Sequence, residues 1–247
     1  MKYLFSGFLF VIIFFVFPLI HATENVTEGM VITPELSKKV IDAITEKYSK
    51  NMYEKYAGVK STRHVTVEWR HPKTNELIET EKVVYVRWDD FYEDLKYEVL
   101  EYTVNGEKKD PSKYDPRESK PGIPHFDKNG EKEYIRELAA VEKVKGKLCY
   151  KIKATPRKPK DEHFKGFLWV TVDNLELIQN EGTSGKSRFG VSDLYVKYQA
   201  KDFGDYFHFT SGYTKVNLNV LGMYKRILIF NFENKNIEPM SLPRKKK

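Results

Sequence analysis

The spacing of apolar residues changes once along this chain, from a helical period to a period of two. After Thr33 and Pro34, apolar side chains recur at three- and four-residue intervals. Thr33 can cap a helix and Pro34 suits a first helical position, so we expect an amphipathic helix over Glu35–Tyr56. From Ser61 onward apolar and polar residues alternate, as in strands with one buried face. The sequence therefore predicts one helix that lies on a sheet.

In the rest of the chain, alternation and turn residues predict roughly eight to ten strands joined by short turns. We expect them at Ser61–Arg70, Lys82–Trp88, Lys96–Val104, Lys147–Thr155, Phe167–Val172, Leu175–Asn180, Asp193–Ala200, Tyr206–Thr210, Lys215–Leu221 and Tyr224–Phe232. Tyr134–Val144 fits a helix or a strand. Short turns favour antiparallel pairing, so the expected fold is mainly β (α+β): a curled antiparallel sheet or incomplete β-barrel with an N-terminal amphipathic helix.

The segment Gly106–Glu133 interrupts this pattern. It is polar and contains four prolines. A loop of this length is uncommon inside a compact domain, so it is either a functional flap or disordered, and the sequence leaves both open. Neither side of it has a self-sufficient sheet, and we therefore expect a single domain over residues 23–240.

The amino end has the parts of a secretory signal. Lys2 precedes an apolar run, and the small residue Ala22 stands before a polar stretch. We expect residues 1–22 to be cleaved and the mature chain to work outside the cytoplasm. An uncleaved membrane anchor is the alternative, because the apolar run approaches the length that spans a bilayer.

The formal charge of +7 is concentrated at the two ends of the chain. Lys2 and the tail residues Arg244, Lys245, Lys246 and Lys247 carry five of these positive charges, which leaves +2 on the body. A near-neutral body argues against a nucleic-acid partner. The basic tail, residues 241–247, is either a solvated end or a weak peripheral contact with anionic lipid headgroups.

Signatures of catalysis and of metal binding are missing from the sequence. No two histidines have metal-ligand spacing, and Gly182–Ser187 lacks the glycine spacing of a phosphate-binding loop, so we expect a turn there. The single cysteine, Cys149, fits a small buried strand residue. We expect no cofactor, no metal and no enzymatic activity, with a hydrolase whose carboxylates meet only on folding as the alternative.

Two predicted strands are apolar on both faces, within Phe167–Val172 and Tyr224–Phe232. Such strands need cover on both faces, or else one face lines a cavity. The aromatic residues that we expect to line a hydrophobic ligand site are Trp69, Trp88, Phe167, Trp169 and Phe209. The alternative is that they form ordinary core.

The order of these parts resembles a family of bacterial exported proteins. Val141–Ile152 contains a strand after Val-x-Gly-Lys, and Phe167–Ile178 continues the motif Gly-x-Leu-Trp-Val that starts at Gly166. Over about Glu131–Phe232 this pairing resembles the periplasmic lipoprotein carriers and outer-membrane lipoprotein-sorting proteins. No arginine here matches the gating position of those carriers.

The resemblance implies a function and a location. It implies a periplasmic, non-enzymatic protein that carries an acyl chain, an acylated protein or another hydrophobic ligand in the concave face of a half-barrel. Related domains are envelope sensors or assembly factors that bind a partner protein, so that role is the alternative.

Overall fold

The structure is a computed structural model that describes residues 26–49, 56–90, 95–114, 128–160, 163–184, 190–203, 207–222 and 224–241. The expected signal, residues 1–22, and the basic residues Arg244–Lys247 lie outside these ranges. The helical elements are α1 (Pro34–Ser49), η1 (Pro111–Lys113) and α3 (Lys128–Glu133). The strands are β1 (Tyr56–Arg70), β2 (Leu77–Asp90), β3 (Lys96–Val104), β4 (Glu107–Lys108), β5 (Tyr134–Val144), β6 (Lys147–Pro156), β7 (Phe164–Thr171), β8 (Leu177–Ser184), β9 (Val191–Asp202), β10 (Phe207–Val220) and β11 (Tyr224–Ser241).

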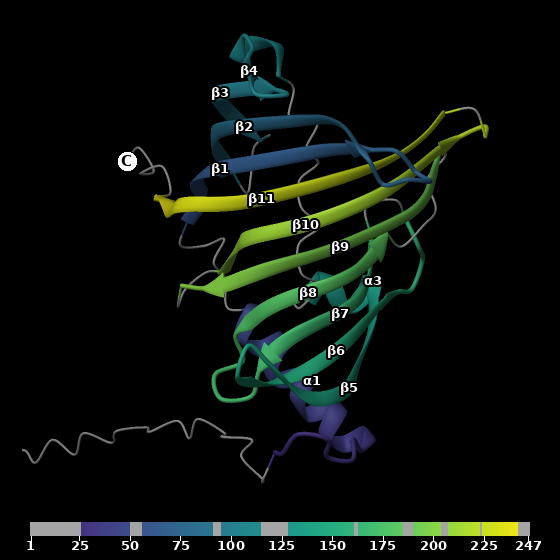
Figure 1. Ribbon diagram of the computed structural model, residues 1–247. Helices are drawn as coiled ribbons and strands as arrows, with labels where there is room; N and C mark the ends of the chain where they lie inside the picture. Colours follow the sequence, from purple (N-terminus) through teal and green to yellow (C-terminus); the bar gives the residue numbers. More distant parts are fainter. Residues whose placement is uncertain are drawn as a thin grey trace, which may run out of the picture.

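The eleven strands within the described ranges form one antiparallel sheet in the order β4-β3-β2-β1-β11-β10-β9-β8-β7-β6-β5. The chain lays down β1 to β4 toward one edge, crosses to the other edge, and returns from β5 to β11 (Figure 1). The last strand, β11, therefore pairs with the first, β1. The sheet is curled and does not close, and this confirms the expected fold class.

One face of this sheet contacts α1, and we call it the inner face; the opposite face is the outer face. Val40 and Ile44 of α1 are buried against Tyr150, Ile152 and Leu168, which places α1 on the half of the sheet formed by β5–β8 (Figure 1). A second core lies on β1, β2, β10 and β11 and includes Val65, Val67, Val83, Tyr85, Phe209 and Phe232. The inner face therefore carries both cores.

Helix α1 begins where the sequence predicts but is shorter than expected. The backbone N–H of Leu36 donates to Thr33 Oγ1 at 3.2 Å, which caps the first turn. The predicted end at Tyr56 is wrong, because α1 ends at Ser49 and Tyr56 starts β1. Gly58 lies within that strand, where a Cβ atom would stand 2.2 Å from the backbone oxygen of Asp89. The glycine permits close strand pairing and does not end a helix.

Most strand predictions are confirmed, and two need correction. Tyr134–Val144, which was ambiguous, is the strand β5. The predicted strands Tyr206–Thr210 and Lys215–Leu221 are one continuous strand, β10, because Gly212 between them pairs with Tyr198 and Phe232. The rings of those two partners meet over Gly212, with centroids 5.5 Å apart, and occupy the space that a side chain would take.

Gly182–Ser184 was expected in a turn but forms the end of β8. Gly182 of β8 pairs with Gly166 of β7, and a Cβ on either glycine would lie within 3 Å of the Phe164 ring. The ring therefore covers a glycine pair inside the sheet, and this packing favours a strand. Residues 185–187 of the same motif lie outside the described ranges.

The polar segment Gly106–Glu133 is described in part. It contains β4, η1 and α3, while residues 115–127 lie outside the described ranges. Tyr114, just after η1, packs its ring against Tyr85 at 6.3 Å and Tyr102 at 5.2 Å. The start of this segment therefore covers part of the inner face over β2 and β3. Among the described helices, none is both long and apolar enough to cross a membrane.

Candidate functional site

The inner face has an apolar surface beyond the reach of the α1 core. Antiparallel register places Leu194, Val216, Leu228 and Trp69 side by side across β9, β10, β11 and β1. The next inner-face row includes Val196, Thr214, Phe230 and Val67. We call the set Trp69, Leu194, Val196, Val216, Leu228 and Phe230 the inner strip.

The inner strip is only partly covered. All six of its side chains are partly buried, whereas neighbouring core residues such as Val65 and Val83 are 3% or less exposed. Trp69, Leu228 and Phe230 pack against the second core, and Leu194, Val196 and Val216 are members of neither core. The strip therefore continues the second core as an apolar surface that is still partly exposed, and a bound molecule could bury it further.

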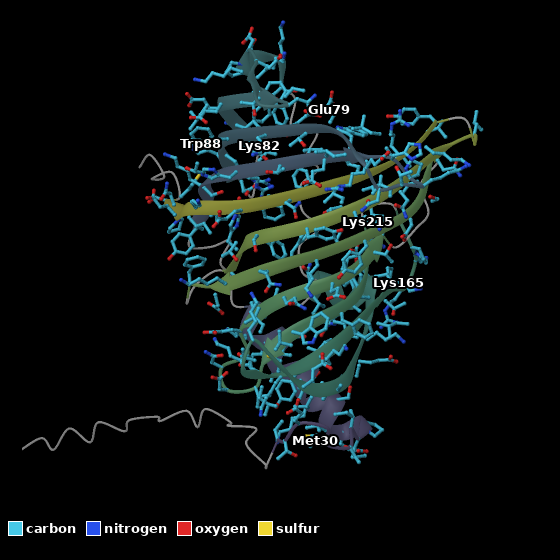
Figure 2. The ribbon with its side chains drawn as sticks, in the orientation of Figure 1. Met30, Glu79, Lys82, Trp88, Lys165 and Lys215 are labelled. Carbon is cyan, nitrogen blue, oxygen red and sulfur yellow. The ribbon has the colours of Figure 1, made fainter. Side chains whose placement is uncertain are left out.

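The outer face of the same strands is mixed in polarity. The row behind the strip contains Tyr195, Lys215, Ile229 and Glu68, and Figure 2 labels Lys215 together with Lys82 and Lys165, which also lie on the outer face. Charged side chains alternate with apolar ones here, as on an ordinary solvated sheet face. The inner face is therefore the better candidate for binding an apolar molecule.

The five predicted lining residues do not share one face. Trp69 and Phe209 lie on the inner face with the second core. Trp88, Phe167 and Trp169 lie on the outer face, because each is paired with an outer-face residue of a neighbouring strand. Of the five predicted residues, the structure thus places only Trp69 and Phe209 together on the inner face.

Outer-face partners cover the three remaining aromatic residues. Trp169 is 5% exposed, and its indole N–H donates to Glu142 Oε1 at 2.7 Å. Lys151 Nζ lies 5.2 Å from the Trp169 ring and 4.8 Å from the Phe167 ring. Lys60 Nζ lies 5.6 Å from the ring of Trp88. The doubly apolar strand β7 therefore has its outer face covered by long charged side chains.

A buried polar cluster lies next to the second core and was not predicted from the sequence. Its members are Arg63, Arg87, Asp89, His208 and Asn234. Arg63 Nε donates to Asn234 Oδ1 at 2.8 Å, and Asn234 Nδ2 donates to the Phe209 carbonyl oxygen at 2.7 Å. Arg87 Nε donates to Asp89 Oδ2 at 2.6 Å. Arg63 and Arg87 are 6% and 1% exposed. Arg63 meets Asn234 only through the pairing of β1 with β11, so no local sequence pattern pointed to this cluster.

His208 is the member of this cluster whose type of side chain ordinarily titrates near neutral pH. Burial lowers its pKa from 6.5 to about 4, and Arg63 and Arg87 act in the same direction while Asp89 opposes them. Its Nε2 lies 3.3 Å from Asn234 Nδ2 and 3.9 Å from Asp89 Oδ2. The neutral ring, with Nε2 accepting from Asn234, fits this arrangement.

We expect the stability of the fold to fall as the pH is lowered from about 6.5 to about 4, partly through His208. The unfolded chain takes up a proton on this ring in that interval and the folded chain does not, so protonation favours unfolding. The contribution is about 3 kcal/mol if the full pKa difference is realised. Urea unfolding at pH 7 and pH 4.5 measures it. H208Q should flatten the pH dependence, and an unchanged slope would contradict the assignment.

The other expectations about chemistry have mixed outcomes. Cys149 is fully buried in β6, as predicted, and burial raises the pKa of its thiol. His163 was expected to be solvated, but it is 6% exposed and its ring lies 5.4 Å from that of Tyr134. Within the described ranges no group of three or more His, Cys, Asp or Glu side chains is placed to hold a metal ion. His125 lies outside those ranges.

Comparison with known proteins gives likenesses of structure only. No family model matches the sequence, and no curated protein matches it. A LolA superfamily protein, NE2245 from Nitrosomonas europaea, is 13% identical, with 83% of this chain and 96% of that chain covered and a TM-score of 0.40. A domain from Vibrio parahaemolyticus, named for outer membrane lipoprotein sorting, is 8% identical, with 84% and 95% covered and a TM-score of 0.40.

A third similar structure is MucB in complex with MucA(peri), at 8% identity, with 83% of this chain and 100% of that chain covered and a TM-score of 0.24. The similar structures thus include the lipoprotein-sorting group that the sequence resembles. Likeness at these identities and scores does not assign a function to the chain.

Proposed function

We propose that this protein is an exported, non-enzymatic binding protein that takes up an acyl chain or similar apolar ligand on the inner strip. The proposal includes a periplasmic location and a ligand that is a lipid or an acylated protein. The observation that carries it is the contrast between the two faces of β9–β11. The inner face offers contiguous, partly covered apolar side chains, and the outer face mixes charged and apolar ones.

Burial of an apolar ligand can supply the free energy of binding without any charged contact. Each methylene that leaves water contributes on the order of 0.8 kcal/mol, so a dozen carbons can supply useful affinity after the costs of association. The six side chains of the inner strip come from four adjacent strands, which hold them in fixed register. A preformed surface of this kind loses little conformational entropy on binding.

We expect the delipidated protein to bind a fluorescent fatty acid saturably, and L228E to weaken that binding by about tenfold or more. The introduced carboxylate would stand in the middle of the inner strip, where a bound chain would have to desolvate it. A tenfold loss corresponds to about 1.4 kcal/mol. Titration of the fluorescent probe, with competition by unlabelled fatty acid, measures both affinities.

I229E is the matched control, because Ile229 is the next residue of β11 but lies on the outer face. It should leave the affinity within about twofold, a change near the measurement error. Circular dichroism must show that both variants are folded. Equal weakening by L228E and I229E would reject the inner strip as the site. Absence of saturable binding by the folded wild-type protein would reject the carrier function, and native mass spectrometry showing a co-purified polypeptide would favour the partner-binding alternative.

A further inference from the structure

The hairpin formed by β10 and β11 projects beyond the strands on either side of it (Figure 1). On one side the pairing with β1 ends at Ile227, and on the other side β9 begins opposite Leu218. Beyond these two positions no described strand pairs with the hairpin, and β10 and β11 pair only with each other, as far as Val220 opposite Tyr224. The end of this hairpin is therefore accessible to another molecule.

The end of the hairpin carries exposed apolar side chains. Leu221 is 71% exposed and Tyr224 is 45% exposed. The neighbouring β1–β2 hairpin adds the exposed residues Leu77 and Ile78, and the pairing of β1 with β2 and β11 places them at the same end of the sheet. Large apolar side chains that gather at one exposed end of a protein mark a site of contact with another molecule or with a membrane.

Leu221 adopts a backbone conformation that is costly for a leucine. Its φ of 53° lies in the left-handed region, where this chain uses asparagine at Asn75 and Asn105. Leu175 also has a positive φ, but its side chain packs against the α1 core. Leu221 belongs to neither core and is mostly exposed. Packing within the described part of the chain therefore does not account for a leucine at this position.

The charge of the hairpin end is positive. Between Asp205 and Glu233 the sequence contains no acidic residue, and Lys225 and Arg226 directly follow Tyr224. Neither cation forms an ion pair within the described part of the chain. The guanidinium carbon of Arg226 lies 5.1 Å from the centre of the Tyr224 ring. Apolar and aromatic side chains flanked by cations are complementary to an anionic membrane surface, because the apolar groups enter the headgroup region and the cations meet phosphates.

We propose that the end of the β10–β11 hairpin docks this protein on the surface of an anionic phospholipid bilayer. Leu221 and Tyr224 enter the headgroup region, and Lys225 and Arg226 contact lipid phosphates. This contact is separate from any contact of the basic tail, because the tail follows Ser241, at the opposite end of β11.

Docking at this end brings the bilayer to one end of the inner strip. The inner-strip residue Val216 is followed on β10 by Leu218 and Val220, which alternation places on the same face. Apolar residues of β10 therefore lead from the inner strip to the docking end, along the path that an acyl chain would take. The docking itself goes beyond the carrier function and does not depend on it, since vesicle binding is measured without an added acyl ligand.

The first test is co-sedimentation of the purified protein with lipid vesicles. We expect tighter binding to vesicles of phosphatidylglycerol and phosphatidylcholine than to vesicles of phosphatidylcholine alone. L221N and K225Q/R226Q should each weaken binding to the anionic vesicles by about tenfold, since the first removes an inserted apolar side chain and the second removes two cations. Asparagine suits the left-handed conformation, so L221N should unfold thermally at or above the Tm of the wild type.

L100N and K145Q/K147Q are the matched controls. Leu100 is an exposed leucine on β3, and Lys145 and Lys147 lie at the β5–β6 turn, at the opposite end of the sheet from the β10–β11 turn. Both variants should keep the affinity for anionic vesicles within about twofold of the wild type.

A fluorescent label locates the contact even if another part of the chain also binds lipid. Cys149 is fully buried, so a thiol reagent should react selectively with the introduced cysteine of L221C or L100C. An environment-sensitive fluorophore at position 221 should brighten and shift to the blue on anionic vesicles, and the same fluorophore at position 100 should not.

Three results would overturn the proposal. They are a wild-type protein with no preference for anionic vesicles, equal binding by the wild type and both hairpin variants, and a fluorophore at position 221 that stays in water. In solution without vesicles, L221N should bind the fluorescent fatty acid like the wild type. A wild-type protein that binds the fatty acid but not the anionic vesicles would reject the docking site and leave the carrier function in place.

Discussion

Arg87→Ala should destabilise the fold by about 3–5 kcal/mol, the cost expected when one partner of a buried ion pair is removed. The Arg87 side chain is 1% exposed, and its guanidinium contacts both carboxylate oxygens of Asp89 through Nε and Nη2. The Asp89 side chain is 15% exposed. Removing the cation leaves that carboxylate in a largely dry site beside the second core, with a cavity where the arginine stem had packed. Urea unfolding at neutral pH gives the free energy of unfolding.

Two further variants separate charge from packing. The double variant R87M/D89N removes both charges and keeps most of the volume, so it should recover a large part of the loss. K38A removes an ion pair of the same chemistry from the surface of α1, where Lys38 and Asp42 are 76% and 57% exposed, and should have no measurable effect. An R87A protein as stable as the wild type would show that Asp89 is well solvated without its partner.

Trp169→Ala should cost about 3–5 kcal/mol of unfolding free energy, the usual range for truncation of a buried large aromatic residue. The side chain is packed on the outer face among Phe167, Lys151 and Glu142, so its removal opens a void and leaves Glu142 without the indole donor. A near-neutral result would mean that the ring faces solvent or a cavity. Chemical denaturation monitored by far-ultraviolet circular dichroism measures the loss, because the tryptophan signal is itself altered.

W88A is the comparison for Trp169. Trp88 is also on the outer face, but its side chain is only partly buried. Its truncation removes less buried area, so we expect a loss of about 1 kcal/mol. If W88A and W169A cost the same, burial of the Trp169 ring is not what stabilises the fold.

The architecture was predictable because it rests on local patterns. Period-two alternation placed the strand Lys96–Val104 at its observed bounds. The errors in the bounds of the elements lie at or beside three glycines. Gly58, Gly182 and Gly212 all lie inside strands, because neighbouring backbone or rings occupy the space beside them. Those neighbours come from other strands, so a local pattern does not contain them.

The site was less predictable than the fold. Alternation shows that Phe167 and Trp169 share a face, but which face meets α1 depends on the pairing of β7 with β6. The sequence therefore could not separate these two residues from Trp69 and Phe209. The polar cluster was missed for the same reason, since Arg63 meets Asn234 only when β1 pairs with β11.

The pairing of β1 with β11 also determines how the chain can reach this fold. Val65 faces Phe232 across the centre of the sheet, so contacts of very high sequence separation join the first strand to the last. The meander β5–β11 is built from neighbouring hairpins and can form early, whereas β1–β3 must wait for β11 before they join the sheet. During synthesis, the edge of β1 stays without its partner until β11 has emerged, so β1–β3 depend on β11 for protection against aggregation.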